Sequence, residues 1–346
     1  MSAPRSYMPH RSQPMFITWL FVLMVLVIIM IAFGGATRLT NSGLSITEWR
    51  PITGALPPLS AAAWQAEFEK YKAIPEFLAE HADMEIEGFR FIYFMEWGHR
   101  QLGRLIGLVY FIPLIIFWRK RSLPDGRELR FVLLLFLIGL QGLIGWWMVS
   151  SGLVNDRVDV SQYRLATHLG LAFIILAIIH WTWRDACDDW PGRPLGPQFQ
   201  GRTVTLFGLI FLQIICGAFV AGTHAGKIYN TWPLMDGGFV PKDYGGLTPF
   251  WLNLFENVAA IQFNHRLLAY IIIIHAIWVL LSTHYYKPMS RAMNVVLGLI
   301  FWQVGLGIWT LLNVAPLGLS LLHQASAIAL YLAALWLMRT AWVDKH

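Results

Sequence analysis

Long apolar runs separated by shorter polar segments set the pattern of this chain. A helix needs about 20 apolar residues to cross the hydrocarbon core of a bilayer. The pattern therefore predicts an all-α integral membrane protein with eight transmembrane helices. We expect the first run to be retained, because it is too long for a signal-peptide core and no convincing cleavage site follows it. The runs span residues 16–38, 91–118, 130–152, 162–183, 203–223, 258–283, 292–313 and 317–338.

Composition supports the membrane interpretation. Of the 346 residues, 56% are hydrophobic and 13% are charged, whereas soluble domains carry about 25% charged residues. The two cysteines, Cys187 and Cys216, lie in a polar connection and in an apolar run. This usage supports neither a disulfide framework nor a cysteine-based metal site.

The distribution of charge predicts the orientation of the chain. The net charge is +6, but the sequence has no long Lys/Arg run of the kind that binds nucleic acid. Basic residues gather in alternate connections, and by the positive-inside rule these connections and both termini are cytoplasmic. The long connection 41–90 has eight Asp/Glu against four Lys/Arg and is expected to face the outside. The basic connections are 1–15, 119–130, 184–202, 284–291 and 339–346.

A weak internal repeat divides the chain into two halves. Gly98, His99 and Arg100 match Asn264, His265 and Arg266, and Gln141 with Gly145 matches Gln303 with Gly307. His168 likewise matches His323. We therefore predict two pseudo-symmetric four-helix bundles, 1–190 and 191–346, related by an axis along the membrane normal.

Four histidines occupy equivalent places in the two halves. His99, His168, His265 and His323 each lie about seven residues after the outer start of an even-numbered helix, which is roughly 10 Å deep at 1.5 Å per residue. Ionisable groups inside a membrane are functional candidates, and facing imidazoles form a bis-axial haem site. The pairs His99 with His168 and His265 with His323 would give two haem sites. The alternative is that helix–helix hydrogen bonds satisfy all four rings.

Three arginines accompany the histidines. Arg100 and Arg266 directly follow the histidines of helices 2 and 6, and Arg104 lies one turn further. A guanidinium there can bind a haem propionate through charge-assisted hydrogen bonds. The alternative is that these side chains snorkel towards lipid headgroups.

The halves differ in front of these histidines. Glu96 precedes His99 by three residues, whereas Gln262 precedes His265. A carboxyl can accept a proton or stabilise positive charge on a carbon, and an amide does both less well. The N-terminal half is therefore expected to hold the chemistry and the C-terminal half a fixed haem. Alternatively, Glu96 is an interfacial carboxylate bonded to Trp97 or to the outer loop.

The other histidines are weaker candidates. His180 and His275 lack matches in helices 8 and 2, so we expect them to be interfacial. His224 lies near the outer end of helix 5, close to the expected site.

The run from Glu96 to Arg104 (EWGHRQLGR), Asn264-His265-Arg266, Thr167-His168 and His323-Gln324 resemble the haem A synthase family, as does the run from Thr37 to Ser45 (TRLTNSGLS). The resemblance extends over essentially all eight helices. It is closest to the proteobacterial and mitochondrial branch, because the outer connections contain no cysteine.

The resemblance implies an enzyme that oxidises the ring D methyl group of haem O to a formyl group, giving haem A for terminal oxidases. His265 and His323 would hold a haem b cofactor. His99 and His168 would bind the substrate haem, with Glu96 as the catalytic carboxylate. The expected location is the bacterial inner membrane, with the haem sites near the periplasmic face.

Two rival functions remain at this point. A membrane electron-transfer cytochrome b would keep two permanent haems, and a transporter would carry no haem. Haem O synthase and an electron-transfer protein are the candidate partners besides haem O and the lipid bilayer. The sequence leaves open the oxygen source, the electron donor or acceptor, the role of loop 41–90 and any homo-oligomer.

Overall fold

The computed structural model describes residues 14–124, 126–154, 157–187, 195–283 and 287–342. Over these residues the regular structure is helical, and eight helices are long and apolar enough to cross a membrane. The prediction of an all-α membrane protein with eight spans is therefore confirmed. The spans are α1 (Pro14–Leu39), α4 (Ile86–Arg119), α5 (Glu128–Ser150), α6 (Gln162–Cys187), α7 (Pro197–Gly222), α8 (Val258–Thr283), α9 (Lys287–Leu312) and α10 (Leu317–Trp342).

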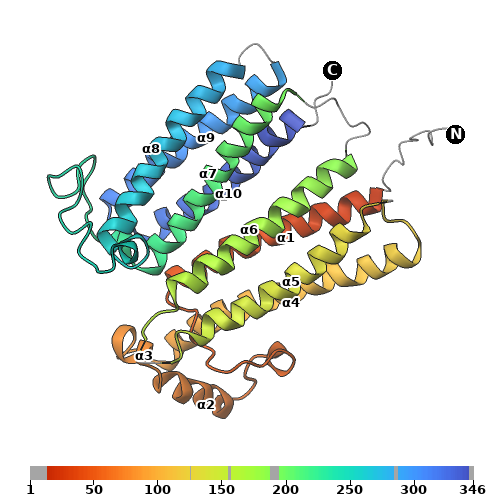
Figure 1. The fold of residues 1–346 in the computed structure, drawn as a ribbon. Coiled ribbons are helices and arrows are strands. Elements are labelled where there is room, and N and C mark those ends of the chain that lie inside the picture. Colours follow the sequence, from red (N-terminus) through yellow and green to blue (C-terminus); the bar gives the residue numbers. More distant parts are fainter. Residues whose placement is uncertain (1–13, 125, 155–156, 188–194, 284–286, 343–346) are drawn as a thin grey trace.

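The eight spans form two groups of four, α1 with α4–α6 and α7–α10 (Figure 1). The groups meet where α6 packs against α7 and α1 packs against α10. One hydrophobic core runs through this seam, and the buried Tyr331 hydroxyl on α10 donates to the Phe173 carbonyl on α6 at 3.1 Å. The expected boundary at residue 190 and the terminal residues 1–13 and 343–346 lie outside the described residues.

Helix α4 starts earlier than its apolar run predicts. It begins at Ile86 rather than at residue 91, so His99 lies 13 residues from its start. The extra turn forms because Phe89, which has no exposed surface, packs into the aromatic cluster above the bundle. A polar and charged segment thus continues the helix beyond the apolar run.

Above this end of the bundle, residues 40–85 fold into a small cap, which lies on the opposite side from the start of α1 and the end of α10 (Figure 1). The cap holds η1 (Thr53–Ala55), α2 (Ala61–Lys72) and α3 (Pro75–Glu80). The Ser60 hydroxyl caps α2 by accepting from the Ala63 N–H at 3.2 Å. Residues 223–257, with η2 (Ala225–Lys227) and η3 (Phe250–Leu254), lie on the same side over the other group. We call this side the cap side.

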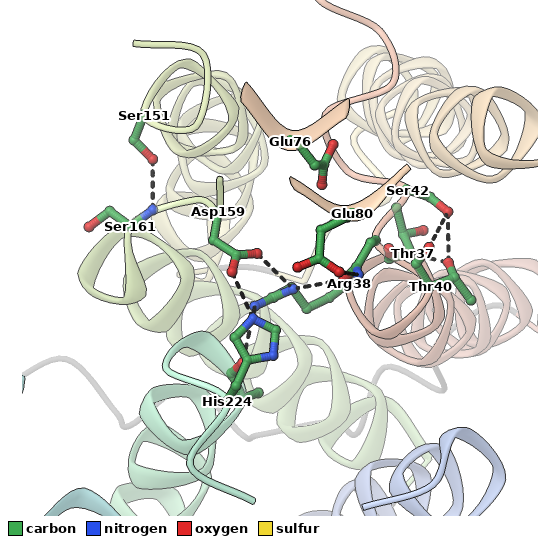
Figure 2. Close-up of polar contacts among 12 residues, drawn as sticks. Thr37, Arg38, Thr40, Ser42, Glu76, Glu80, Ser151, Asp159, Ser161 and His224 are labelled. Carbon is green, nitrogen blue, oxygen red and sulfur yellow. Dashed lines mark hydrogen bonds and ion pairs between the residues drawn. The ribbon is translucent and has the colours of Figure 1, made fainter. Parts of the chain in front are cut away.

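Polar contacts join the two groups at both ends of the spans. On the cap side, Arg38 of α1 pairs with Asp159 at 3.1 Å and donates to the Ala221 carbonyl of α7 at 3.2 Å. Asp159 also contacts the His224 ring at 2.7 Å (Figure 2). At the opposite end, Arg339 of α10 pairs with Asp185 of α6 at 3.3 Å.

Candidate functional site

Each of the four histidines lies against a glycine on a neighbouring helix. The glycine leaves room for the ring, since a Cβ at that position would lie 2.9 to 3.4 Å from the imidazole Cε1 atom. The same arrangement therefore occurs four times, twice in each half. The pairs are His99 with Gly34 of α1, His168 with Gly145 of α5, His265 with Gly217 of α7, and His323 with Gly307 of α9.

The histidines approach one another in the predicted pairs. His99 is close enough to His168 for the charge of one ring to affect the other, and the same holds for His265 and His323. In both halves the paired rings come from two helices of one four-helix group. The structure thus brings each predicted pair within range of electrostatic interaction, one pair in each half.

The rings have few hydrogen-bond partners. The Nδ1 atoms of His99, His168 and His323 are buried and form no hydrogen bond within the described part of the chain. Buried polar atoms are normally bonded, so unpaired imidazole nitrogens in an apolar bundle point to a missing ligand. Within the same residues, no three His, Cys, Asp or Glu side chains could hold a bare metal ion. Two facing imidazoles instead fit a haem, which supplies four iron ligands itself and takes two from the protein.

Glutamine side chains donate hydrogen bonds to the backbone carbonyls of three of the four histidines. Gln141 donates to the His168 carbonyl at 3.0 Å, and Gln303 donates to the His323 carbonyl at 2.8 Å. Gln213 donates to the His265 carbonyl at 3.0 Å and lies 3.2 Å from both of its ring nitrogens. The repeat marked Gln141 and Gln303 without giving them a role, and Gln213 was missed.

Helix α1 lacks the fourth glutamine. Gly34 and Gly217 each lie against a histidine, and this equivalence places Met30 at the position of Gln213. The carbonyl of the next residue, Ile31, accepts from Gln324 of α10, the residue after His323, at 2.9 Å. One half is thus linked directly to the helix that carries a histidine of the other half.

Glu96 is buried and fully bonded. Its Oε2 atom accepts from the Ile46 N–H at 2.7 Å and from the Ser45 hydroxyl at 2.9 Å. Its Oε1 atom pairs with the Arg100 guanidinium at 2.5 Å. The Arg100 Nε–H also donates to Oε1 at 3.1 Å, so four donors hold this carboxylate between α4 and the cap, one helical turn above His99.

Gln262 holds the equivalent loop in the other half with reversed polarity. Its Nε2 atom donates to the carbonyls of Ala225, at 2.6 Å, and Ile228. Its Oε1 atom accepts from Arg266 Nη2 at 2.7 Å. The loop beside Glu96 presents donors, whereas the loop beside Gln262 presents acceptors, so each side chain matches its own loop.

The three arginines anchor loop backbone on the cap side. Arg100 donates to the carbonyls of Ile46 and Glu48 at 2.9 and 3.2 Å. Arg104 donates to the carbonyls of Arg50 and Pro51 at 3.1 and 3.0 Å. These residues keep the strap 46–55 against α4.

Arg266 fixes the opposite loop in the same way. It donates to the carbonyls of Tyr229 and Thr231 at 2.7 and 2.9 Å. Its Nε atom is buried without a partner among the described residues and remains able to donate to a ligand.

The remaining histidines lie apart from the two pairs. His180 is buried near the end of α6 that lies away from the cap, and His275 contacts the Arg202 carbonyl at 3.1 Å. His224 belongs to the seam, where it meets Arg38 and Asp159 (Figure 2). The pKa of Asp159 is lowered: burial opposes the shift, but the His224 hydrogen bond and the Arg38 charge outweigh it.

Comparison with known proteins identifies relatives of this chain over nearly its whole length. Residues 17–335 match a family model described as cytochrome oxidase assembly protein. A haem A synthase of Maricaulis maris is 49% identical over 332 residues, covering 95% of this chain and 96% of its own. One from Caulobacter vibrioides is 46% identical, covering 94% of this chain and 95% of its own. One from Paracoccus denitrificans is 47% identical, covering 90% and 84%.

Proposed function

Because the chain belongs to the haem A synthase family, we propose that it oxidises the ring D methyl group of haem O to a formyl group. The reaction passes through an alcohol and gives haem A for terminal oxidases. The observation that carries the proposal is the pair of buried imidazole sites, each lined by glycine, of which one alone has a carboxylate one turn away. An electron-transfer cytochrome would need no carboxylate for chemistry at this position, where Glu96 also anchors its loop.

The N-terminal half, residues 1–190, is the substrate half in this proposal. His99 and His168 bind the iron of haem O from opposite sides. The glycines behind them set the distance between the two rings, because each ring lies against backbone rather than against a side chain. Ligation by two histidines would fix the plane of the porphyrin, and Glu96, one helical turn from His99, would then lie near the edge of the ring.

Glu96 is the catalytic carboxylate. Oxidation of a methyl carbon builds positive charge on that carbon, and a fixed carboxylate stabilises it. The Ile46 N–H, the Ser45 hydroxyl and Arg100 hold both oxygens in place, so the charge is positioned before the reaction starts. A second oxidation of the alcohol gives a geminal diol, which loses water to leave the aldehyde.

The C-terminal half, residues 191–346, holds a haem b cofactor. His265 and His323 would be its iron ligands, and the free Nε–H of Arg266 would bind a propionate. Such a haem supplies one-electron redox chemistry when it is bound. Gln213 and Gln303 fix the backbone of both of these ligands, whereas in the N-terminal half a glutamine bonds the carbonyl of His168 alone among the two histidines.

The proposed location is the bacterial inner membrane. Both termini are cytoplasmic, and the cap side, with the two haem sites, faces the periplasm, following the acidic loop and the basic connections at the opposite end. Haem O synthase and an electron-transfer protein are the proposed partners.

The test is co-expression with a haem O supply, followed by chromatography of the bound haems. Wild type should contain haem b together with haem O, its alcohol or haem A. His99→Ala or His168→Ala should lose the haem O series and keep haem b, whereas His265→Ala or His323→Ala should lose haem b. Haem b in both halves, without any modified haem, would identify an electron-transfer cytochrome instead.

A further inference from the structure

A chain of three side chains crosses the cap. The Tyr71 hydroxyl donates to Glu76 Oε2 at 3.2 Å and lies 2.6 Å from the Nδ1 atom of His81. All three residues come from α2, α3 and the residue that follows α3. They lie outside the membrane spans and outside the haem sites described above.

This chain has two protonation states with equally complete hydrogen bonds. In one state, protonated Glu76 donates to the Tyr71 oxygen, and the Tyr71 hydroxyl donates to His81 Nδ1. In the other, His81 Nδ1–H donates to Tyr71, and Tyr71 donates to the Glu76 carboxylate. Moving from the first to the second transfers one proton from Glu76 to His81, with two O–H bonds broken and an O–H and an N–H bond formed. Tyr71 is neutral in both states, and no electron moves.

Burial gives the chain an inner and an outer end. Glu76 is 3% exposed and Tyr71 is 0% exposed, whereas His81 is partly exposed at the surface of the cap. Desolvation raises the pKa of Glu76 to about 8, so this carboxyl holds a proton near neutral pH. Desolvation also raises the pKa of Tyr71 and lowers that of His81, so Tyr71 stays neutral and His81 readily passes its proton to water.

The inner end of this chain faces a polar layer between the cap and the spans, which contains Arg38 and Asp159. Glu76 lies opposite Arg38 and Asp159 (Figure 2). The charges of Asp159 and Glu96 raise its pKa and the charge of Arg38 lowers it, while Tyr71 is its hydrogen-bond partner and Glu80 ends the same helix. No cation pairs directly with Glu76 within the described residues, which leaves the carboxyl free to exchange its proton.

We propose that Glu76, Tyr71 and His81 form a relay that carries protons between this polar layer and the water outside the cap. The proposal rests on the proposed function: methyl oxidation releases protons when oxygen comes from water and consumes protons when it comes from O₂. In both cases the site below the cap must exchange protons with solvent. The relay moves protons in either direction, because its two states differ only in where the proton lies.

The first experiment measures the conversion of haem O to haem A by Glu76→Gln, Tyr71→Phe and His81→Ala. Each variant should be about a hundredfold slower, the lower end of the range for positioned proton transfer. Free imidazole should restore His81→Ala, because it can fill the space of the lost ring. The control is Tyr93→Phe, which removes a hydroxyl from the same aromatic cluster without breaking the chain and should keep the wild-type rate.

The second experiment needs no activity. Infrared spectroscopy follows the carboxylic acid band that is present in wild type and absent in Glu76→Gln, after transfer into D₂O. The band should shift within the mixing time in wild type and at least about tenfold more slowly in Tyr71→Phe, because exchange then requires local opening of the cap.

Unchanged exchange in Tyr71→Phe, or wild-type haem A formation by Tyr71→Phe and His81→Ala, would overturn the relay. If wild type forms no haem A, the proposed function fails, while the exchange measurement still decides whether the relay exists. If Glu76→Gln does not fold, the partly exposed His81→Ala tests the same path.

Discussion

The backbone N–H of Ile46 donates to Glu96 at 2.7 Å, whereas the carbonyl of Ile228, in the matching loop of the second half, accepts from Gln262. The duplicated loops thus bind their helices with opposite hydrogen-bond polarity. Glu96 therefore anchors the strap 46–55 in this structure and, in the proposed function, also supplies the catalytic carboxylate. An experiment on Glu96 must separate these two roles.

We expect Glu96→Gln to abolish formyl formation and to lower stability by about 1.5–3 kcal/mol, because an amide nitrogen would face Arg100 or the Ile46 N–H. Haem analysis and thermal unfolding in detergent measure the two effects. The control is Glu87→Gln, an exposed carboxyl at the start of the same helix, which should change neither. Full haem A production by Glu96→Gln would exclude Glu96 as the catalytic carboxylate.

Gly145→Ala should displace the His168 ring, because the new Cβ would lie 3.0 Å from its Cε1 atom. Overpacking of this kind costs about 1–3 kcal/mol, and the substrate half should lose haem O while haem b is retained. Gly142→Ala, on the same helix, meets no atom within 4 Å and serves as the control. Equal haem contents in both variants would contradict the proposed role of the glycine.

The glycine behind His323 allows the same test in the C-terminal half. Gly307→Ala should displace the His323 ring and lower the haem b content, while Gly305→Ala, which faces open space, should not. The absorption spectrum of reduced protein measures haem b directly. Loss of haem O, rather than of haem b, from Gly307→Ala would show that the two halves are assigned the wrong way round.

Stability should depend on pH through Glu76. Its pKa is raised to about 8 by burial, so its contribution is fully present below the unfolded value of about 4.3 and is lost as the pH rises through about 8. The slope for one group is at most about 1.4 kcal/mol per pH unit. Glu76→Gln should remove this dependence, as measured by thermal unfolding from pH 5 to 9. An unchanged slope would mean that Glu76 is ionised in the folded protein.

Arg38→Met should lower stability by about 1–3 kcal/mol, because it removes the donor to the Ala221 carbonyl and one of the partners of Asp159, which keeps its contact with His224. The two haem contents should stay unchanged, since neither imidazole pair contacts Arg38. Arg90→Met is the control, because its partner Glu87 is exposed and 4.0 Å away, and such pairs contribute little. Equal thermal unfolding of the two variants would contradict the role of Arg38 in the seam.

The eight spans could be predicted from sequence because a bilayer imposes one long apolar run on every helix that crosses it. The cap could not, since α2 and α3 carry mixed polar and aromatic residues whose burial depends on tertiary packing around Phe89. The early start of α4 has the same cause.

The histidines were found from sequence because polar groups are rare in such runs. The glycines behind them and Gln213 were not, because a small or polar residue acquires its role only when the neighbouring helix is placed. The polarity of the two loops was equally unreadable, so the Glu96 and Gln262 difference indicated chemistry alone, whereas the structure also gives each residue an anchoring role.

Across the seam, Arg38 donates to the Ala221 carbonyl and Asp159 contacts His224 on the cap side, while Arg339 pairs with Asp185 at the opposite end. Contacts at both ends of the seam oppose the rocking motion of one helix group against the other that alternating-access transporters use. In the proposed function, contacts at both ends of the seam would help to keep the distance between the two imidazole pairs constant, as electron transfer between two haems requires.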